Sequence, residues 1–238
     1  MIKYKKKDRE NLCIIPARKG SKGIKNKNII NFRGQPLIQH TFNIAKKIKN
    51  QFDILVSTDS KRIESLALKN DFYFLGLRPK VLSGDKVETK DVLKYEIRRI
   101  EKLKKKKYKS ILLLQATCPF RNYKDIFLSL RKINSNSYDS VVSVAEVGAD
   151  HPLRMKIFKS KYLVNYIKQK KENMKPRQLL PKVFLRSGSI YLFKRDVLMK
   201  TNSLVGKKCY GLILKGKKTI NIDSKDQLKI LRSKYEKK

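Results

Sequence analysis

The chain has 238 residues, of which 40% are apolar, so one α/β domain can bury a substantial core of its own. Its 59 lysine and arginine residues against 20 acidic ones give a formal net charge of +39, which raises nucleic acid or an anionic membrane as a partner. No apolar run approaches the roughly 20 residues of a membrane span, and the basic N-terminus lacks a secretory signal, so we expect a cytoplasmic protein without membrane insertion.

The high charge alone does not identify a nucleic-acid-binding protein. The lysines are dispersed, and dense runs such as residues 101–109 are typical of solvated helix ends. RNA-recognition signatures, zinc-finger spacings and helix-turn-helix patterns are absent from the sequence. We therefore expect most of the charge to be unrelated to a specific nucleic acid, and keep a basic nucleic-acid-binding protein as the alternative from another functional class.

The cysteines and histidines predict neither a disulfide framework nor a zinc site. Cys13, Cys118 and Cys209 are an odd count at wide spacings without a CxxC pair. His40 and His151 are the only histidines, and neither lies close to a cysteine in the sequence.

Short apolar runs alternate with segments of helical period, which predicts βαβ units and a largely parallel sheet. In the first part of the chain we expect strands at residues 12–17, 52–58, 72–75, 110–116 and 139–147, and helices at 36–49, 60–69, 88–105 and 123–134. The run at 110–116 is the most apolar and predicts a central strand.

Residues 148–186 break this alternation and predict an excursion from the sheet. A strand and a helix within 188–198, strands at 209–214 and 218–223, and a final helix with Ser224 as its N-cap follow. We therefore expect a single domain over residues 1–238, with the excursion inside it.

The strongest local signal is the loop after the first strand, PARKGSKGIKNKNI at residues 16–29. Its glycines let backbone N–H groups approach phosphate oxygens, and its cations balance their charge. The loop matches neither the Walker A pattern nor GxGxxG. By itself, a solvated basic turn explains it equally well.

Several segments in a fixed order resemble the acylneuraminate cytidylyltransferases, the CMP-sialic acid synthetases and their relatives. They are PARKGSKGIKNKN, STDS at 57–60, LRPKVLSGD at 77–85, LLLQATCPFR at 112–121, LRSGSIYLF at 185–193 and INID at 220–223. The resemblance covers about residues 12–228. It implies a mostly parallel open α/β sheet flanked by helices, the Rossmann-like fold of nucleotide-diphospho-sugar transferases, and a homodimer in which the excursion at 148–186 packs across the partner.

The same resemblance implies transfer of CMP from CTP to the anomeric hydroxyl of a nine-carbon acidic 2-keto-3-deoxy sugar of the N-acetylneuraminate type, with release of pyrophosphate. Pseudaminic, legionaminic and eight-carbon ulosonic acids stay open as the sugar. Magnesium or manganese is the implied cofactor, since nucleotidyl transfer depends on positioning and on charge neutralisation.

The resemblance also implies site residues by position. Arg18 and Lys27 are the expected charge partners of the triphosphate, and Arg78 is the residue at the base. The nucleotide set comprises Arg18, Ser21, Lys22, Lys27, Asn28, Arg78 and Thr89, and the sugar-binding set Gln115, Thr117 and Arg177. A surface arginine at a turn is the alternative for Arg78, and one more exposed cation is the alternative for Arg177.

The implied metal site departs from the family pattern. The family's two aspartates correspond to Asn221 and Asp223, and an asparagine supplies an oxygen but no charge. We therefore expect Asp223 to be the principal metal ligand, with Asn221 beside it, and count Arg18, Lys27 and Asp223 as catalytic. Deprotonation of the sugar hydroxyl is expected near Asp223, for which a helix cap is the alternative.

Overall fold

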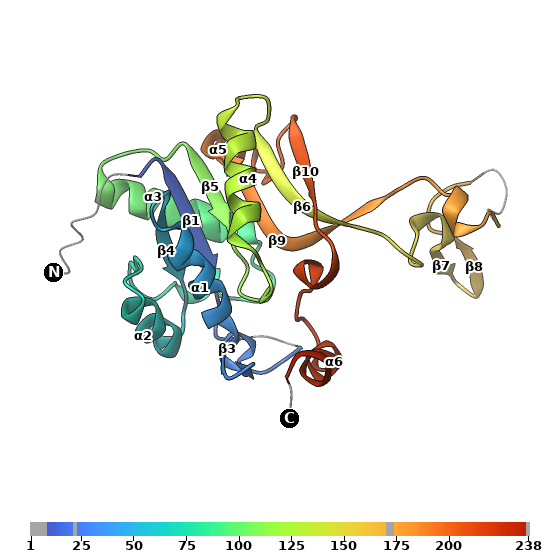
Figure 1. Cartoon of the computed structure of the whole chain (residues 1–238), viewed down its shortest axis with the longest axis horizontal. Helices are drawn as coiled ribbons and strands as arrows, with labels where there is room; N and C mark the ends of the chain where they lie inside the picture. The colour runs from blue at the N-terminus through green and yellow to red at the C-terminus, as the bar shows by residue number, and fades with distance from the viewer. Residues whose placement is uncertain (1–8, 21–22, 170–173, 237–238) are drawn as a thin grey trace.

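A six-stranded sheet of order β10-β6-β9-β5-β1-β4 forms the centre of the protein (Figure 1). The structure is a computed structural model that describes residues 9–20, 23–169 and 174–236. β1 pairs in parallel with β4 and β5, β10 pairs in parallel with β6, and β9 is antiparallel to both of its neighbours. The prediction of a mostly parallel sheet is confirmed. The strands are β1 Asn11–Pro16, β4 Phe52–Ser57, β5 Ser110–Leu113, β6 Ser140–Glu146, β9 Phe184–Lys194 and β10 Cys209–Ile213.

Helices cover both faces of the sheet, which explains why β1 and β5 are apolar along nearly their whole length. One face packs on α1 Leu37–Ile48, α2 Lys61–Lys69 and α4 Tyr123–Asn134. The other face packs on α3 Thr89–Lys104 and α5 Arg195–Thr201. The predicted helices are confirmed. The start of α4 is fixed by Asn122, whose side chain accepts from Lys124 N in the first turn.

The C-terminal helix α6 Lys225–Tyr235 belongs to a third, smaller core. It packs on a short ribbon, β2 Asn31–Phe32 and β3 Gln35–Pro36, that the sequence did not predict. Ser224 caps α6 through a reciprocal capping box with Gln227, which confirms the predicted cap. This small core brings the residues just before α6 to the loop after β1.

Residues 148–186 include a projection that extends from one side of the body, here named the arm (Figure 1). Its tip is an antiparallel hairpin of β7 Lys156–Lys159 and β8 Tyr162–Asn165. Apolar side chains on the arm are exposed, among them Phe158, Tyr162, Leu163, Met174, Leu179 and Leu185. None of the helices in the described ranges has the length and apolar character of a membrane span.

Two predicted strands are absent. Within 72–75 only Tyr73 forms an isolated bridge, to Leu55, because the chain turns away at Gly76, whose φ is +97°. At 216–223 the chain forms a 3-10 turn, η5 Gly216–Thr219, followed by a segment outside any strand whose Ile222 N–H donates to Thr117 O at 2.9 Å. Its buried residue Ile222 packs on α6 instead of joining the sheet, so the apolar alternation reflects that small core.

Candidate functional site

A hollow of about 390 Å³ opens beyond the carboxyl ends of β1 and β5. Ligands of open α/β sheets collect at this edge. The residues predicted for the site that line it are Arg18, Lys27, Asn28, Arg78, Thr89, Gln115, Thr117, Asn221 and Asp223. Ser21 and Lys22, also predicted, lie outside the described residues. We call this space the first hollow.

The loop after β1 is tied to the segment before α6. Lys27 Nζ lies 2.7 Å from Asp223 Oδ1, an ion pair between residues 196 positions apart. Gly23 packs directly on the Asp223 backbone, and a Cβ at this glycine would overlap the Asp223 carbonyl oxygen. The Nδ2 of the buried Asn28 donates to Arg18 O at 2.9 Å and closes the loop. The loop after β1 and the segment before α6, which both line the first hollow, are thus fixed to each other.

Two arginines line the first hollow, and they differ in solvent exposure and in their partners. Arg18 forms an ion pair with Asp85 across the hollow, and both side chains remain partly exposed. Arg78 is only 5% exposed, and its Nε donates to Ser83 Oγ at 3.2 Å. Burial lowers the pKa of Arg78, while the charges of Asp59 and Glu96 oppose this shift. The alternative of a surface arginine at a turn is therefore wrong for Arg78.

A second hollow, of about 710 Å³, adjoins the first and shares Gln115, Asn221 and Asp223 with it. Among the described residues that line the second hollow, Arg186 is the only cation and Asp223 the only anion. Burial raises the pKa of Tyr191 in its wall, and the nearby charge of Arg186 opposes that shift. The rest of the lining is uncharged and mixed, with the apolar residues Ala145, Leu185, Ile220, Ile230 and Leu231 beside polar ones such as Ser187, Thr219 and Gln227.

Asn221 and Asp223 sit at the boundary of the two hollows. Asn221 Nδ2 donates to Asp223 Oδ2 at 2.5 Å, and since a carboxylate only accepts, the amide oxygen must face the other way. That oxygen lies 3.7 Å from the Cys118 thiol, whose pKa is raised by burial so that it remains a donor. In this orientation the Asn221 amide nitrogen holds the Asp223 carboxylate, and the Asn221 amide oxygen points away from that carboxylate and cannot bind a metal ion next to it.

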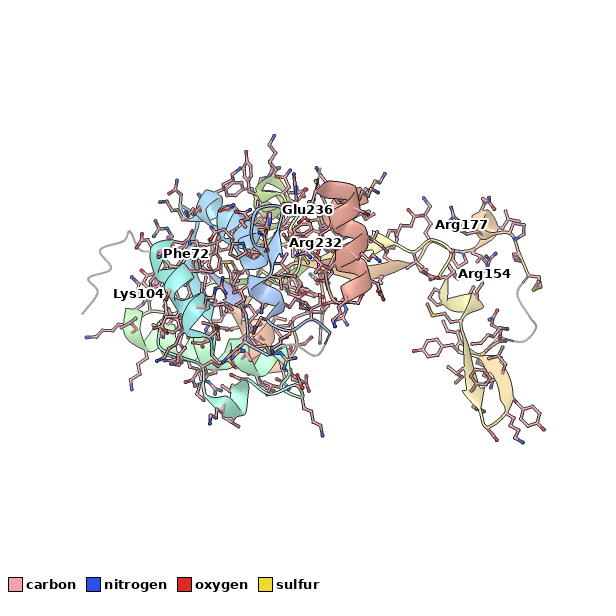
Figure 2. The ribbon with its side chains drawn as sticks, turned by 90° about the horizontal axis from the view of Figure 1, so that it is seen from below. Phe72, Lys104, Arg154, Arg177, Arg232 and Glu236 are labelled. Carbon is pink, nitrogen blue, oxygen red and sulfur yellow. The ribbon has the colours of Figure 1, made fainter. Side chains whose placement is uncertain are left out.

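Arg177 lies on the arm, in the 3-10 turn η4 Arg177–Leu179, and lines neither hollow of its own chain (Figure 2). Its Nη1 lies next to Gly148 near the base of the arm. The two histidines also lie away from the hollows. His40 Nε2 is 2.8 Å from Phe32 O, and His151 Nε2 is 2.9 Å from Pro181 O, so each is engaged by backbone.

Metal-binding capacity at the site rests on few ligands. Within the described ranges, no three His, Cys, Asp or Glu side chains gather closely enough to hold an ion. Asp223 is half exposed and faces both hollows, so it can share an ion with phosphate oxygens. Magnesium often uses one or two carboxylates and completes its shell with water and phosphate. The donor set fits an ion that arrives with a nucleotide.

Sequence comparisons agree with this geometry. A family model described as "Cytidylyltransferase" matches residues 12–234. The chain is 31% identical to post-translational flagellin modification protein B of Campylobacter coli over 93% of both proteins. It is 29% identical to CMP-N,N'-diacetyllegionaminic acid synthase of Campylobacter jejuni, again over 93% of both. An N-acylneuraminate cytidylyltransferase of Streptococcus agalactiae is 28% identical, but the chain spans only 51% of that protein's length.

A solved structure of similar fold is also found. The solved structure of CMP:2-keto-3-deoxy-manno-octonic acid synthetase complexed with CTP superposes with a TM-score of 0.64, covering 94% of this chain and 97% of that one. At 18% identity this similarity establishes the fold.

Proposed function

Because the chain belongs to the cytidylyltransferase family, we propose that it transfers CMP from CTP to the anomeric hydroxyl of a nine-carbon acidic 2-keto-3-deoxy sugar. The observation that carries this proposal is the pair of adjoining hollows that share Gln115, Asn221 and Asp223. The first hollow gathers cations suited to a nucleoside triphosphate, and the second holds a single cation, Arg186, in a wall of apolar and uncharged polar residues. A transfer between two substrates requires such a shared boundary.

In the first hollow, Arg18 and Lys27 are the proposed partners of the triphosphate. The ion pair with Asp85 holds Arg18 at the rim of the hollow, where phosphate oxygens can replace that carboxylate, whereas Lys27 keeps its ion pair with Asp223 and offers its remaining ammonium protons to the phosphates. Thr89 begins α3, so the positive end of that helix dipole also faces the nucleotide. Arg78 keeps free donors for the base, and Asn28, Ser21 and Lys22 complete the proposed nucleotide site.

In the second hollow, Gln115 and Arg186 are the proposed contacts of the acidic sugar, with Thr117 at the rim of the first hollow beside them. Arg186 forms no ion pair among the described residues, so its guanidinium is available to a carboxylate. The apolar wall suits acyl groups on the sugar. The sequence reasoning missed Arg186, which lies within the LRSGSIYLF segment that it had singled out.

The proposed reaction forms a bond between the anomeric oxygen and the α-phosphorus and breaks the bond from that phosphorus to the oxygen bridging to the β-phosphate. Pyrophosphate leaves with the electron pair of that bond. The hydroxyl proton passes to a base at the boundary, and Asp223 is the only carboxylate of the described residues that lines both hollows. Lys27 and Asn221 hold the two oxygens of that carboxylate in place.

Asp223 is also the proposed ligand of magnesium or manganese, with Asn221 able to take part only if its amide turns. Bound there with CTP, the ion would supply positive charge to the phosphate oxygens as the transfer proceeds.

We infer further that the protein is a homodimer in the cytoplasm, where CTP is made. The arm exposes Phe158, Tyr162 and Leu163 to solvent in the single chain, and a second copy is a partner that would cover them. Docked across a partner, the arm would bring Arg177 to the neighbouring second hollow, which its own chain does not do. Sedimentation of the purified protein tests this directly, and a monomer at micromolar concentration would refute it.

The function is tested by incubating the protein with each nucleoside triphosphate, magnesium and a panel of ulosonic acids while pyrophosphate is measured. We expect release with CTP and a nine-carbon acid, and the panel separates N-acetylneuraminic, legionaminic, pseudaminic and eight-carbon acids. Absence of pyrophosphate release with CTP and every sugar in the panel would refute the proposal. Weak nucleic-acid binding that collapses at physiological salt would mark the high charge as incidental.

A further inference from the structure

Arg121 is a buried cation outside both linings. It is 5% exposed and lies just before α4. Its Nε donates to Ser189 O at 2.6 Å, its Nη2 to Gln115 O at 2.8 Å and its Nη1 to Thr41 Oγ1 at 3.2 Å. No carboxylate among the described residues pairs with it.

Burial of a guanidinium without a counter-ion is costly, because the charge loses its water and only neutral acceptors replace it. Burial accordingly lowers the pKa of Arg121. An apolar side chain would fill the same core position without that cost. The arginine therefore requires a reason that packing does not supply, and its two backbone acceptors indicate one.

Those two acceptors belong to two segments that contribute to the lining of the second hollow. Gln115 follows β5 and lines both hollows, whereas Ser189 lies in a bulge of β9, next to Gly188, which lines the second hollow. At this bulge, the two steps from Val142 to Val144 on β6 are matched by five steps from Tyr191 to Arg186 on β9. Bulges of this kind redirect side chains next to active sites.

The bulge is anchored on its other side by serine hydroxyls. Ser143 Oγ accepts a hydrogen bond from Ile190 N–H at 2.8 Å and another from the Ser187 hydroxyl at 2.8 Å. At its centre, Gly188 has a φ of +74°, and a Cβ there would lie 2.8 Å from Gln115 Oε1. The bulge thus meets the side chain of Gln115 while Arg121 ties together the backbones of both segments.

We propose that Arg121 is a positioning residue that sets the separation between Gln115 and the β9 bulge, and with it the width of the second hollow and the direction of Arg186. It acts on the sugar substrate through these two segments without touching it. The inference rests on the proposed function for its kinetic consequences, but the positioning itself can be measured without a substrate.

The test compares R121K and R121A with R195M. Arg195 is a matched control, since it is a largely buried arginine on α5 that pairs with Glu101 at 2.7 Å, far from both hollows. Binding of CTP is measured by calorimetry, and KM for each substrate by pyrophosphate release. Hydrogen exchange is followed at residues 184–192, and thermal unfolding confirms that each variant is folded.

For both Arg121 variants we expect the sugar KM to rise about tenfold or more while the dissociation constant of CTP stays within about threefold. Exchange at 184–192 rises in R121K and R121A and stays unchanged in R195M, even where R195M loses equal thermal stability. Added guanidinium at millimolar concentration restores the sugar KM of R121A, whereas methylammonium does not, because only the planar ion reproduces the fork of donors.

A sugar KM within about twofold of wild type in both Arg121 variants, or equal rises for sugar and CTP, overturns the proposal by giving Arg121 a general structural role. If R121A does not fold, R121K carries the same comparison. If the wild-type protein releases no pyrophosphate, the proposed function fails, and unchanged exchange at 184–192 would then overturn the positioning role independently.

Discussion

Gly20 and Gly23 provide a matched pair for testing how closely the loop after β1 is packed on the segment that carries Asp223. A Cβ at Gly20 meets nothing within 4 Å, whereas a Cβ at Gly23 would overlap the carbonyl oxygen of Asp223. The obstacle at Gly23 is backbone and cannot rotate away. The Gly23→Ala substitution must therefore push the loop and the Asp223 segment apart.

The two substitutions are expected to change the stability of the protein in opposite directions. Overpacking of this kind costs about 1–3 kcal/mol, which for a domain of this size lowers Tm by about 2–12 °C. Gly20→Ala restricts only the unfolded chain and should stabilise the protein by about 0.4–1 kcal/mol. The displacement in Gly23→Ala also separates Lys27 from Asp223, so we expect kcat/KM for CTP to fall about tenfold or more.

Both variants are measured by thermal unfolding and by pyrophosphate release at varied CTP. Equal Tm and equal kcat/KM in the two variants would refute the close packing of the loop on Asp223. A loss of Tm in Gly23→Ala with unchanged kinetics would keep the packing but remove its connection to the chemistry.

The remaining predictions concern the boundary and the rim of the hollows. Gly188→Ala should raise the sugar KM with little change in CTP affinity, because the new Cβ displaces the Gln115 side chain; kinetics with unchanged sugar KM would contradict this. Asp85→Asn should tighten CTP binding about two- to tenfold in calorimetry, since it frees Arg18 and removes a negative charge beside the triphosphate, at a stability cost of about 1 kcal/mol or less. Arg18→Lys keeps the positive charge but loses the bidentate contact of the guanidinium with phosphate, so KM for CTP should rise although the charge is unchanged. A KM for CTP equal to that of the wild type would show that charge alone matters. Asp223→Asn and Asp223→Ala should both lower kcat about 10²-fold or more, and near-normal turnover in both would remove Asp223 from the mechanism.

The elements with clear local signals were predictable. The helix at 123–134 has an asparagine cap and a regular apolar stripe, and Ser224 with Gln227 forms a capping box that the sequence displays. The direction of β9 was not predictable, because side-chain alternation is the same in parallel and antiparallel strands. The alternation at 218–223 gave a false strand, since packing under α6 produces the same pattern.

The first hollow was predictable only from the fixed order of several segments, because the loop after β1 alone is explained equally well as a solvated basic turn, and Arg78, Gln115 and Asp223 join it from other parts of the chain. The second hollow was not, because its lining converges from β6, β9 and α6 only in the folded chain. Arg186 and Arg121 are single arginines in a sequence with 59 basic residues, so neither stands out by type. Burial distinguishes Arg121, and proximity to Asp223 and Tyr191 distinguishes Arg186.

The ion pair between Lys27 and Asp223 joins residues from opposite ends of the chain, 196 positions apart. During synthesis, this ion pair can form only after the 196 residues that follow Lys27, up to Asp223, have been added. Contacts of such large sequence separation form late and slowly in folding. A product truncated between β10 and Asp223 would therefore contain every strand of the sheet but lack the carboxylate at the boundary of the two hollows, and we expect it to be inactive.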